Sequence, residues 1–205
     1  MSAREEVLAA VRSALHPAAS SPAPVASPPP VPSVPGPDQA PGEEVVALFA
    51  GRVADYRAEV TRCGAAELAE VVSSIVADAH GVVVPPGLDL ELPGATLDDD
   101  LTAAQLDGIE AVVTRASIGI AVTGTVVLDH GRGQGRRSVT LLPDLHVCIV
   151  DERQVVSDVG DALARLDPRR PQTWVSGPSA TSDIELSRVE GVHGPRRLHV
   201  VLVGD

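Results

Sequence analysis

The chain has 205 residues, enough for one domain with an appendage, because domains typically hold about 100–200 residues. It contains one Phe, one Trp and one Tyr, so small and branched aliphatic side chains must build the core. All 16 basic residues are Arg, and the lack of Lys excludes Schiff-base and P-loop lysine chemistry.

The negative charge is concentrated in one part of the chain. The formal net charge is −12, and residues 43–114 hold 3 Arg against 14 acidic residues, whereas residues 115–205 hold 11 of each. Binding along a nucleic-acid backbone needs a dense cationic surface, so we expect no nucleic-acid partner. A local group of arginines could still hold one small anion.

Cysteine usage and hydropathy bound the cofactor and the compartment. Cys63 and Cys148 are far apart and form no C-x-x-C pair, so we expect neither a disulfide framework nor a cysteine-ligated iron–sulfur cluster. We assign no cofactor and no metal-binding residue to this chain. No run of 18 apolar residues occurs, and the start of the chain lacks the apolar stretch of a signal peptide. We expect a cytoplasmic protein with no membrane span.

The first 42 residues differ in composition from the rest. Ser2 and Glu5 have capping-box spacing, and apolar residues then recur at helical intervals, which predicts an amphipathic helix over residues 1–16. Ten of the 25 residues from Pro17 to Pro41 are proline, which is typical of an extended linker, here residues 17–42. The helix is thus tethered, and it docks either on its own domain or on a partner.

Residues 43–205 alternate between helical and strand patterns. Apolar faces at residues 45–56 and 68–76 predict helices, as does a capping box at Thr102 with Gln105. Ser157 and Asp161 are expected to cap a further helix that runs through Leu166. Short apolar runs predict strands at residues 82–84, 111–114, 118–121, 125–128, 139–142, 147–150, 174–175 and 198–203. The run at residues 139–142 would form a hairpin with residues 125–128. The pattern predicts an α/β domain with a mixed sheet flanked by helices.

Two segments in the middle of this domain could bind a ligand. In Thr123-Gly124-Thr125 a glycine allows close backbone approach between two hydroxyls, although a β-bulge satisfied by local bonds has the same residues. Residues 129–137 hold three glycines and three arginines, which suit a carboxylate or phosphate. A mobile solvated loop would explain that composition equally well.

A third segment runs from Ser176 through a Gly-Pro turn to a helix start that Ser182 and Glu185 would cap. Such a turn offers amide and hydroxyl donors to an anion. Asp183 and Glu185 in the first helical turn already complement the dipole, so they favour a structural cap, a metal or an acid–base role. His193 lies in a glycine-flanked turn and is the histidine best placed for function, whereas His146 and His199 fit half-buried structural positions.

An ordered set of motifs, densest after residue 110, resembles the lactate utilisation protein C family, the LUD domain. The motifs are Thr123-Gly124-Thr125, Gly135-Arg136, Leu142-Pro143-Asp144-Leu145-His146, the segment from Ser176 to Glu185 and Gly191-Val192-His193-Gly194-Pro195. The resemblance implies a fold similar to the sugar-phosphate isomerase and CoA-transferase (NagB/RpiA-type) superfamily. It also implies a role in oxidising L-lactate to pyruvate beside iron–sulfur partner subunits, which would carry the clusters. Many relatives have Glu directly before the Thr-Gly-Thr turn, where this chain has Val122.

We therefore expect a subunit of an L-lactate oxidation system that provides a small-anion site. The expected ligand-binding residues are Thr123, Gly124, Thr125, Arg136, Ser176, Gly177, Ser179 and Thr181, and the expected catalytic residues are Asp183, Glu185 and His193. Two alternatives stay open. One is a non-catalytic assembly module that binds partners through the tethered helix, and the other is a stand-alone isomerase or CoA-transferase-like enzyme acting on a small phosphorylated or acyl substrate.

Overall fold

The computed structural model describes residues 4–8, 41–181, 189–190 and 194–204. The chain divides into two units, residues 1–33 and 34–205. In the first unit residues 4–8 are helical and exposed, within the predicted amphipathic helix. The predicted linker falls almost wholly outside the described residues. Among the described residues, no helix has the length and apolar character needed to cross a membrane.

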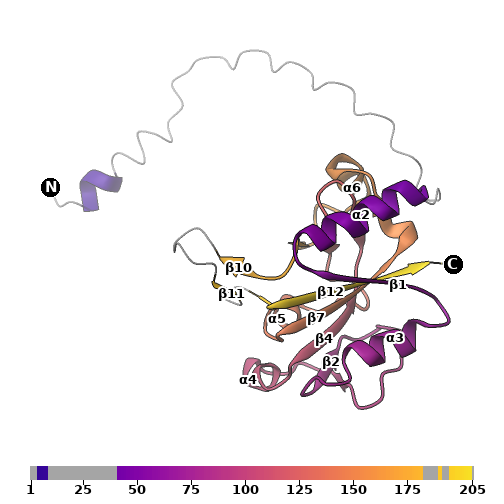
Figure 1. The fold of residues 1–205 in the computed structure, drawn as a ribbon. Coiled ribbons are helices and arrows are strands. Elements are labelled where there is room, and N and C mark those ends of the chain that lie inside the picture. Colours follow the sequence, from indigo (N-terminus) through magenta and orange to yellow (C-terminus); the bar gives the residue numbers. More distant parts are fainter. Residues whose placement is uncertain (1–3, 9–40, 182–188, 191–193, 205) are drawn as a thin grey trace. The chain divides into compact units, whose positions relative to one another are not determined.

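A parallel sheet of six strands forms the centre of the second unit (Figure 1). Its order is β1 (Glu59–Gly64), β12 (Arg197–Gly204), β7 (Leu145–Asp151), β4 (Ala111–Arg115), β2 (Val82–Val84) and β3 (Thr96–Leu97), and every pairing is parallel. Strands β4, β7 and β12 are buried along almost their whole length, as expected for strands covered on both faces.

Helices cover both faces of this sheet. Helix α2 (Glu43–Asp55) buries Val46, Phe49 and Val53 against β7 and β12, while α3 (Leu68–Ile75) packs on the alternate residues of the same strands. Figure 1 shows α2 above and α3 below strands β1 and β12. Two short helices, α4 (Ala103–Asp107) and α5 (Arg137–Leu141), cover β2 and β4 through a separate apolar cluster.

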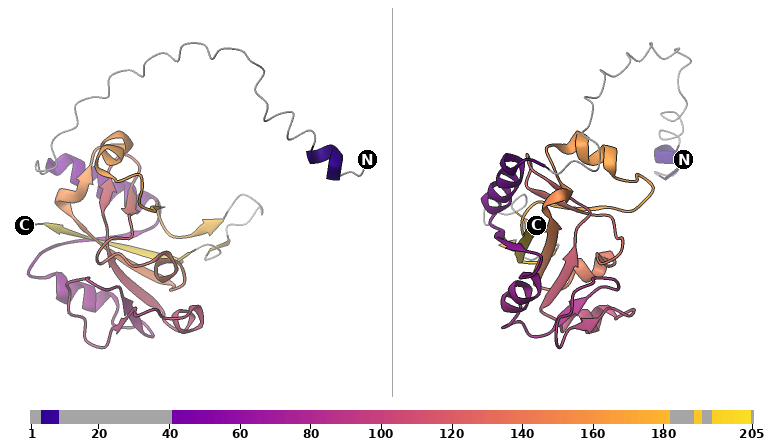
Figure 2. Two further views of the ribbon diagram at one scale, coloured as in Figure 1. Left: turned by 180° about the vertical axis from the view of Figure 1, so that it is seen from behind. Right: turned by 90° about the vertical axis from the view of Figure 1, so that its right-hand side faces the viewer.

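A second sheet of four strands lies between α2 and α6 (Val159–Arg165). Its order is β8 (Val155–Val156), β5 (Ile118–Ile120), β6 (Thr125–Leu128) and β9 (Thr173–Val175), with antiparallel pairing of β6 to both neighbours. One face shares the apolar core of α2 and the other packs on α6. Figure 2 shows this part of the unit from behind and from the side. A 3-10 turn, η1 (Glu152–Gln154), links β7 to β8.

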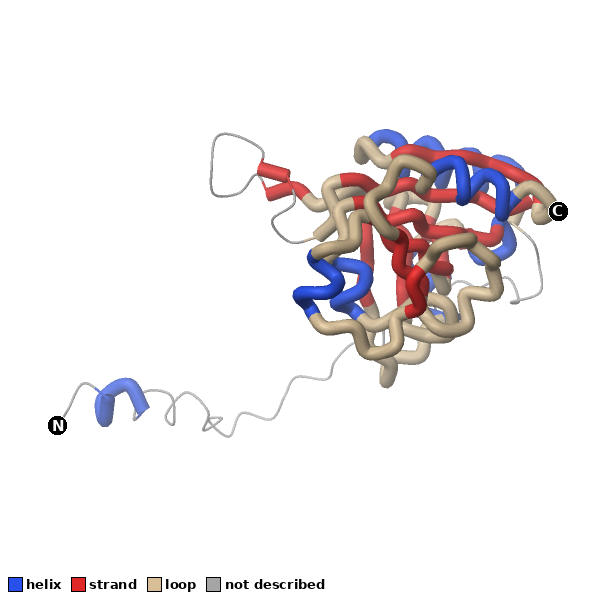
Figure 3. The backbone as a smooth tube through the Cα atoms, turned by 90° about the horizontal axis from the view of Figure 1, so that it is seen from below, coloured by secondary structure: helices blue, strands red, loops and turns tan. Residues whose placement is uncertain are grey.

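Strands β10 (Ala180–Thr181) and β11 (Val189–Glu190) pair antiparallel and extend away from the two sheets (Figures 1 and 3). The helix start predicted after residue 181 lies outside the described residues. Of Thr181, the structure describes the backbone in β10.

The predicted α/β class is confirmed, but the single mixed sheet is in fact a parallel sheet and a separate mixed sheet. The predicted strand at residues 139–142 is wrong, because this segment belongs to α5. The hairpin partners of β6 are instead β5 and β9. The cap of α6 is Asp158, whose side chain accepts from the Asp161 amide, and not Ser157. The capping box of Thr102 and Gln105 is confirmed.

Candidate functional site

The Ser-Gly-Pro-Ser turn follows directly from β9 and contacts the start of the segment that leads to β12. Gly177 has a φ of +79°, which glycine adopts without strain. The Ser179 amide donates to the Pro195 carbonyl over 2.8 Å. Two motifs that are separate in sequence, Ser176–Ser179 and Gly194–Pro195, are therefore neighbours in the fold.

A chain of hydroxyls joins this turn to the Thr-Gly-Thr turn between β5 and β6. Thr123 Oγ1 and Thr125 Oγ1 are 2.7 Å apart, and Thr125 Oγ1 lies 2.7 Å from Ser176 Oγ. Thr125 is buried and Val122 is about half exposed. The structure thus links two of the three predicted ligand segments through Thr125 and Ser176.

The glycines of both turns lie against helix α2 and its end. A Cβ on Gly124 would lie 2.6 Å from the backbone carbon of Arg52, and one on Gly177 would lie 2.7 Å from Tyr56 Cβ. The φ of Gly124 is +58°. These close approaches are a structural reason for glycine at both positions, independent of any ligand.

A cavity of about 300 Å³ opens beside the Ser-Gly-Pro-Ser turn. Its lining includes three predicted residues, Ser176, Gly177 and Ser179, together with Arg137 and His146, which the sequence did not assign to the site. Thr123, Gly124, Thr125 and Arg136 do not line it. The lining contains His146 and Leu198, so the cavity lies near the amino ends of β7 and β12.

Arg137 is the guanidinium that this cavity offers. It is exposed at the start of α5, and it makes no ion pair within the described residues. A planar guanidinium beside the hydroxyls of Ser176 and Ser179 suits a small carboxylate, which Arg binds through two parallel hydrogen bonds. The Gly/Arg composition of residues 129–137 was the signal for such a role, although the family resemblance pointed to the neighbouring Arg136.

His146 forms a buried wall of the cavity. Its Nε2 lies 2.8 Å from Thr114 Oγ1, and the residue is 2% exposed. Burial lowers the pKa of His146 to about 4, so the ring is neutral at pH 7. A neutral imidazole can donate or accept a hydrogen bond, and the structural role expected of this histidine agrees with its contact.

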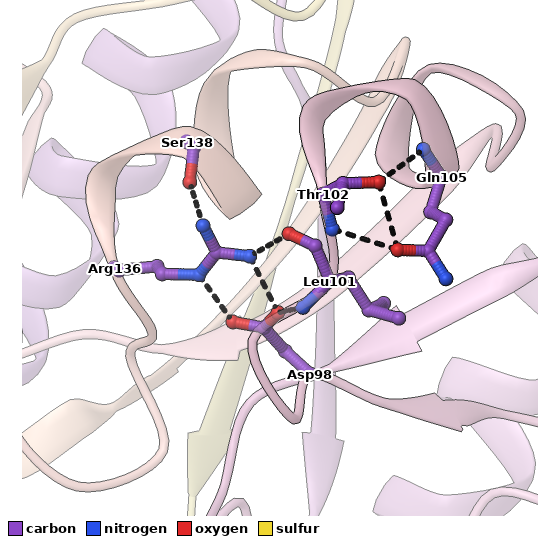
Figure 4. Close-up of polar contacts among 6 residues, drawn as sticks. All are labelled: Asp98, Leu101, Thr102, Gln105, Arg136 and Ser138. Carbon is purple, nitrogen blue, oxygen red and sulfur yellow. Dashed lines mark hydrogen bonds and ion pairs between the residues drawn. The ribbon is translucent and has the colours of Figure 1, made fainter.

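Arg136 is engaged elsewhere. Its Nε and Nη2 donate to the two carboxylate oxygens of Asp98 at 2.9 and 2.8 Å, its Nη1 donates to Ser138 Oγ at 2.9 Å, and Nη2 also donates to the Leu101 carbonyl (Figure 4). The hydrogen bond from Arg136 holds the pKa of the buried Asp98 carboxyl below its usual range. This geometry ties the loop before α5 to the loop before α4, whose capping box lies beside it in Figure 4.

The three predicted catalytic residues, Asp183, Glu185 and His193, lie outside the described residues. They stay predictions. Within the described ranges, no group of three or more His, Cys, Asp or Glu side chains could hold a metal ion.

Comparison with known proteins gives consistent matches. Residues 95–203 match the LUD domain family. The chain is 45% identical to lactate utilization protein C of Deinococcus radiodurans over 78% of this chain and 80% of that protein. It is 33% identical to lactate utilization protein C of Shouchella clausii over 53% of this chain and 50% of that protein. A crystal structure of a DUF162 family protein from Deinococcus radiodurans matches with a TM-score of 0.67 and 38% identity, covering 78% of this chain and 97% of that one. The chain therefore belongs to the LUD domain family and is a homologue of lactate utilization protein C.

Proposed function

We propose that this protein takes part in the oxidation of L-lactate to pyruvate as one subunit beside iron–sulfur proteins. The names of its relatives and its membership of the LUD domain family support this role. Oxidation of lactate releases two electrons and two protons. In this role, clusters in the partner subunits would accept the electrons, and this chain would bind the substrate.

The small-anion site would be the cavity beside the Ser-Gly-Pro-Ser turn. The observation that carries this assignment is the convergence of Arg137, Ser176 and Ser179 on one cavity of about 300 Å³. A lactate carboxylate would bind the Arg137 guanidinium, and a serine hydroxyl would bind the 2-hydroxyl group. Thr125 positions Ser176 through their hydrogen bond. Asp183, Glu185 and His193 stay the candidates for proton transfer.

The test is lactate oxidation by the complex reconstituted with its iron–sulfur partners under anaerobic conditions. Replacing Arg137 with Gln removes a charged donor, and we expect kcat/KM for L-lactate to fall about tenfold or more. Arg169, which is exposed and does not line the cavity, provides the matched control Arg169→Gln. Equal activity of the Arg137 and Arg169 variants would contradict the site.

A second function is favoured by the packing of the predicted motifs. Gly124 packs against α2, Gly177 packs against Tyr56 at the end of α2, and Arg136 is paired with Asp98. These residues therefore have structural roles that need no ligand. A non-catalytic assembly module would need only this scaffold and a docking element. Deleting residues 1–40 separates the two functions, because a module that docks through the tethered helix would lose complex formation while the remaining domain stays folded.

A further inference from the structure

A larger cavity, of about 580 Å³, lies on another part of the folded unit. It is bounded by the connection from β4 to β5, the loop after β6, η1 and the end of α6. Arg115 ends β4 and Arg153 lies in η1 directly after β7, so the cavity is at the carboxyl ends of two adjacent parallel strands. Many ligands of open parallel sheets bind outside this end of the strands.

Five arginines line this arginine cavity, namely Arg115, Arg132, Arg153, Arg165 and Arg170, and the only acidic residue in the described lining is Asp129. The chain as a whole carries a net charge of −12, so this local excess of positive charge runs against the overall balance. Grouped guanidinium ions repel one another, most strongly where water is partly excluded. An anion bound among them would remove that repulsion.

Some of these guanidinium groups already form ion pairs or hydrogen bonds with the protein, and one has a buried nitrogen whose hydrogen-bonding capacity is unsatisfied. Arg170 pairs with Asp129 at 2.7 Å, Arg132 pairs with Asp89 at 2.8 Å, and Arg115 Nε donates to the Leu88 carbonyl at 3.2 Å. Arg165 Nε is buried and has no hydrogen-bond partner in the described part of the chain. Buried polar atoms in folded proteins almost always have a partner, so this donor points to a missing acceptor.

The wall that carries Asp129 is ordered by its own hydrogen bonds. Ser117 Oγ donates to Asp129 Oδ1 over 2.6 Å, Gln134 Nε2 donates to Ser117 Oγ over 2.8 Å, and the Asp129 amide donates to Gln134 Oε1 over 2.7 Å. The Gly131 amide also donates to Asp129. The carboxylate therefore accepts from neighbours within its own wall as well as pairing with Arg170, and it is the only carboxylate in the described lining against five arginines.

We propose that the arginine cavity binds a small organic anion with two or more phosphate or carboxylate groups. A single carboxylate occupies one or two guanidinium forks, and here five arginines surround one cavity. The volume falls within the range of about 300–1,000 Å³ that is usual for small-molecule sites. The described lining has no aromatic side chain, so charge and hydrogen bonds, not ring stacking, provide recognition. This inference does not depend on the role in lactate oxidation.

Calorimetric titration of the full chain at constant ionic strength tests the ligand class. The probes are inorganic pyrophosphate, citrate and acetate, a monocarboxylate that is not the ligand proposed for the cavity beside Ser176. We expect pyrophosphate or citrate to bind at least about tenfold more tightly than acetate, because only the first two engage several arginines. The stronger of the two identifies phosphate or carboxylate chemistry. Equal affinity for all three anions, or no measurable binding of pyrophosphate and citrate, overturns the proposal.

Variants test the location. Arg165→Gln should weaken the preferred polyanion about tenfold, and Arg132→Gln, at a side chain that is 75% exposed and safe for folding, should weaken it about threefold or more. Arg169→Gln removes the same charge at a residue that is next to Arg170 in sequence but does not line the cavity, so this variant should bind the polyanion with the affinity of the parent. Thermal unfolding without ligand checks that each variant is folded. Parent-like affinity in a folded Arg132 or Arg165 variant, or an equal loss in Arg169→Gln, overturns the assignment.

Discussion

Replacing Gly124 with Ala should destabilise the folded unit strongly, because two separate costs act at this position. The φ of +58° is left-handed, which costs a residue with a Cβ about 1–2 kcal/mol. The added Cβ would also lie 2.6 Å from the Arg52 carbonyl carbon, 2.8 Å from its oxygen and 2.8 Å from the Val53 nitrogen. These are backbone atoms of α2, so no side-chain rotation relieves the overlap, and such overpacking costs about 1–3 kcal/mol. We expect a loss of about 2–5 kcal/mol in the free energy of unfolding.

Gly51 provides the matched control. It lies in the same helix, and a Cβ there would meet no atom within 4 Å. Alanine at this position removes the entropic cost of a helical glycine, so Gly51→Ala should stabilise the protein by about 0.5–1 kcal/mol. The two variants make the same chemical change with opposite expected signs.

Urea unfolding followed by circular dichroism measures both free energies, with the slope of the transition checked for constancy. A loss of less than about 1 kcal/mol in Gly124→Ala would contradict the close packing of the Thr-Gly-Thr turn on α2. Titration of L-lactate against the folded variant then shows whether a displaced turn also disturbs the cavity beside Ser176, which is joined to Thr125.

Three further predictions concern ionisable groups. Asp98→Asn should lower the free energy of unfolding at pH 7 by about 1–3 kcal/mol by leaving Arg136 without its acceptor. Because the pKa of Asp98 is lowered in the folded protein, the difference from the parent should begin to shrink as the pH falls below about 3.9, where this residue takes up a proton in the unfolded chain, and it should be lost once the pH has fallen through the lower pKa of the folded protein. The pKa of His146 is lowered to about 4 in the folded protein, so between about pH 6.5 and pH 4 the unfolded chain binds a proton that the folded protein does not. Urea titrations should therefore show the free energy of unfolding of the parent falling by about 3 kcal/mol across this pH range. The fall should be smaller in His146→Gln, which lacks the titrating ring. Burial raises the pKa of the Cys148 thiol to about 12, so a thiol reagent at pH 8 should modify Cys148 only after unfolding. The less buried Cys63 should react in the native protein. Rapid modification of both thiols in the native protein would contradict the buried position of Cys148.

The long periodic and apolar segments could be predicted from the sequence because local pattern and burial agree there. Helical periodicity predicted α2 and α3, and apolar runs predicted the inner strands β4, β7 and β12, at the positions where the structure has them. The edge strand β1 escaped notice because Glu59–Gly64 has no buried residue, and only its parallel pairing with β12 makes it a strand. The run at residues 139–142 misled because four residues are too short to separate strand from helix.

The candidate site divides in the same way. Ser176 and Thr125 could be singled out from their glycine turns, and the structure joins them by a hydrogen bond. Arg136 and Arg137 are neighbours in sequence, and only the fold shows that one pairs with Asp98 while the other lines the cavity. The arginine cavity was out of reach, because its members come from separate segments that no spacing connects.

Residues 129–137 connect these results. Their composition fitted either a mobile loop or an anion-binding one, and the structure favours a held loop. Asp129 accepts from Ser117, and His130 lies 2.8 Å from the Gly135 carbonyl through Nδ1 and 2.9 Å from Thr173 Oγ1 through Nε2. Arg132 faces the arginine cavity, and Arg137 lines the cavity beside Ser176. The hydrogen bonds of His130 fix the backbone of the loop that carries these two arginines. Each guanidinium therefore reaches its own cavity from an ordered backbone, and an anion that binds at either cavity does not first have to order the loop.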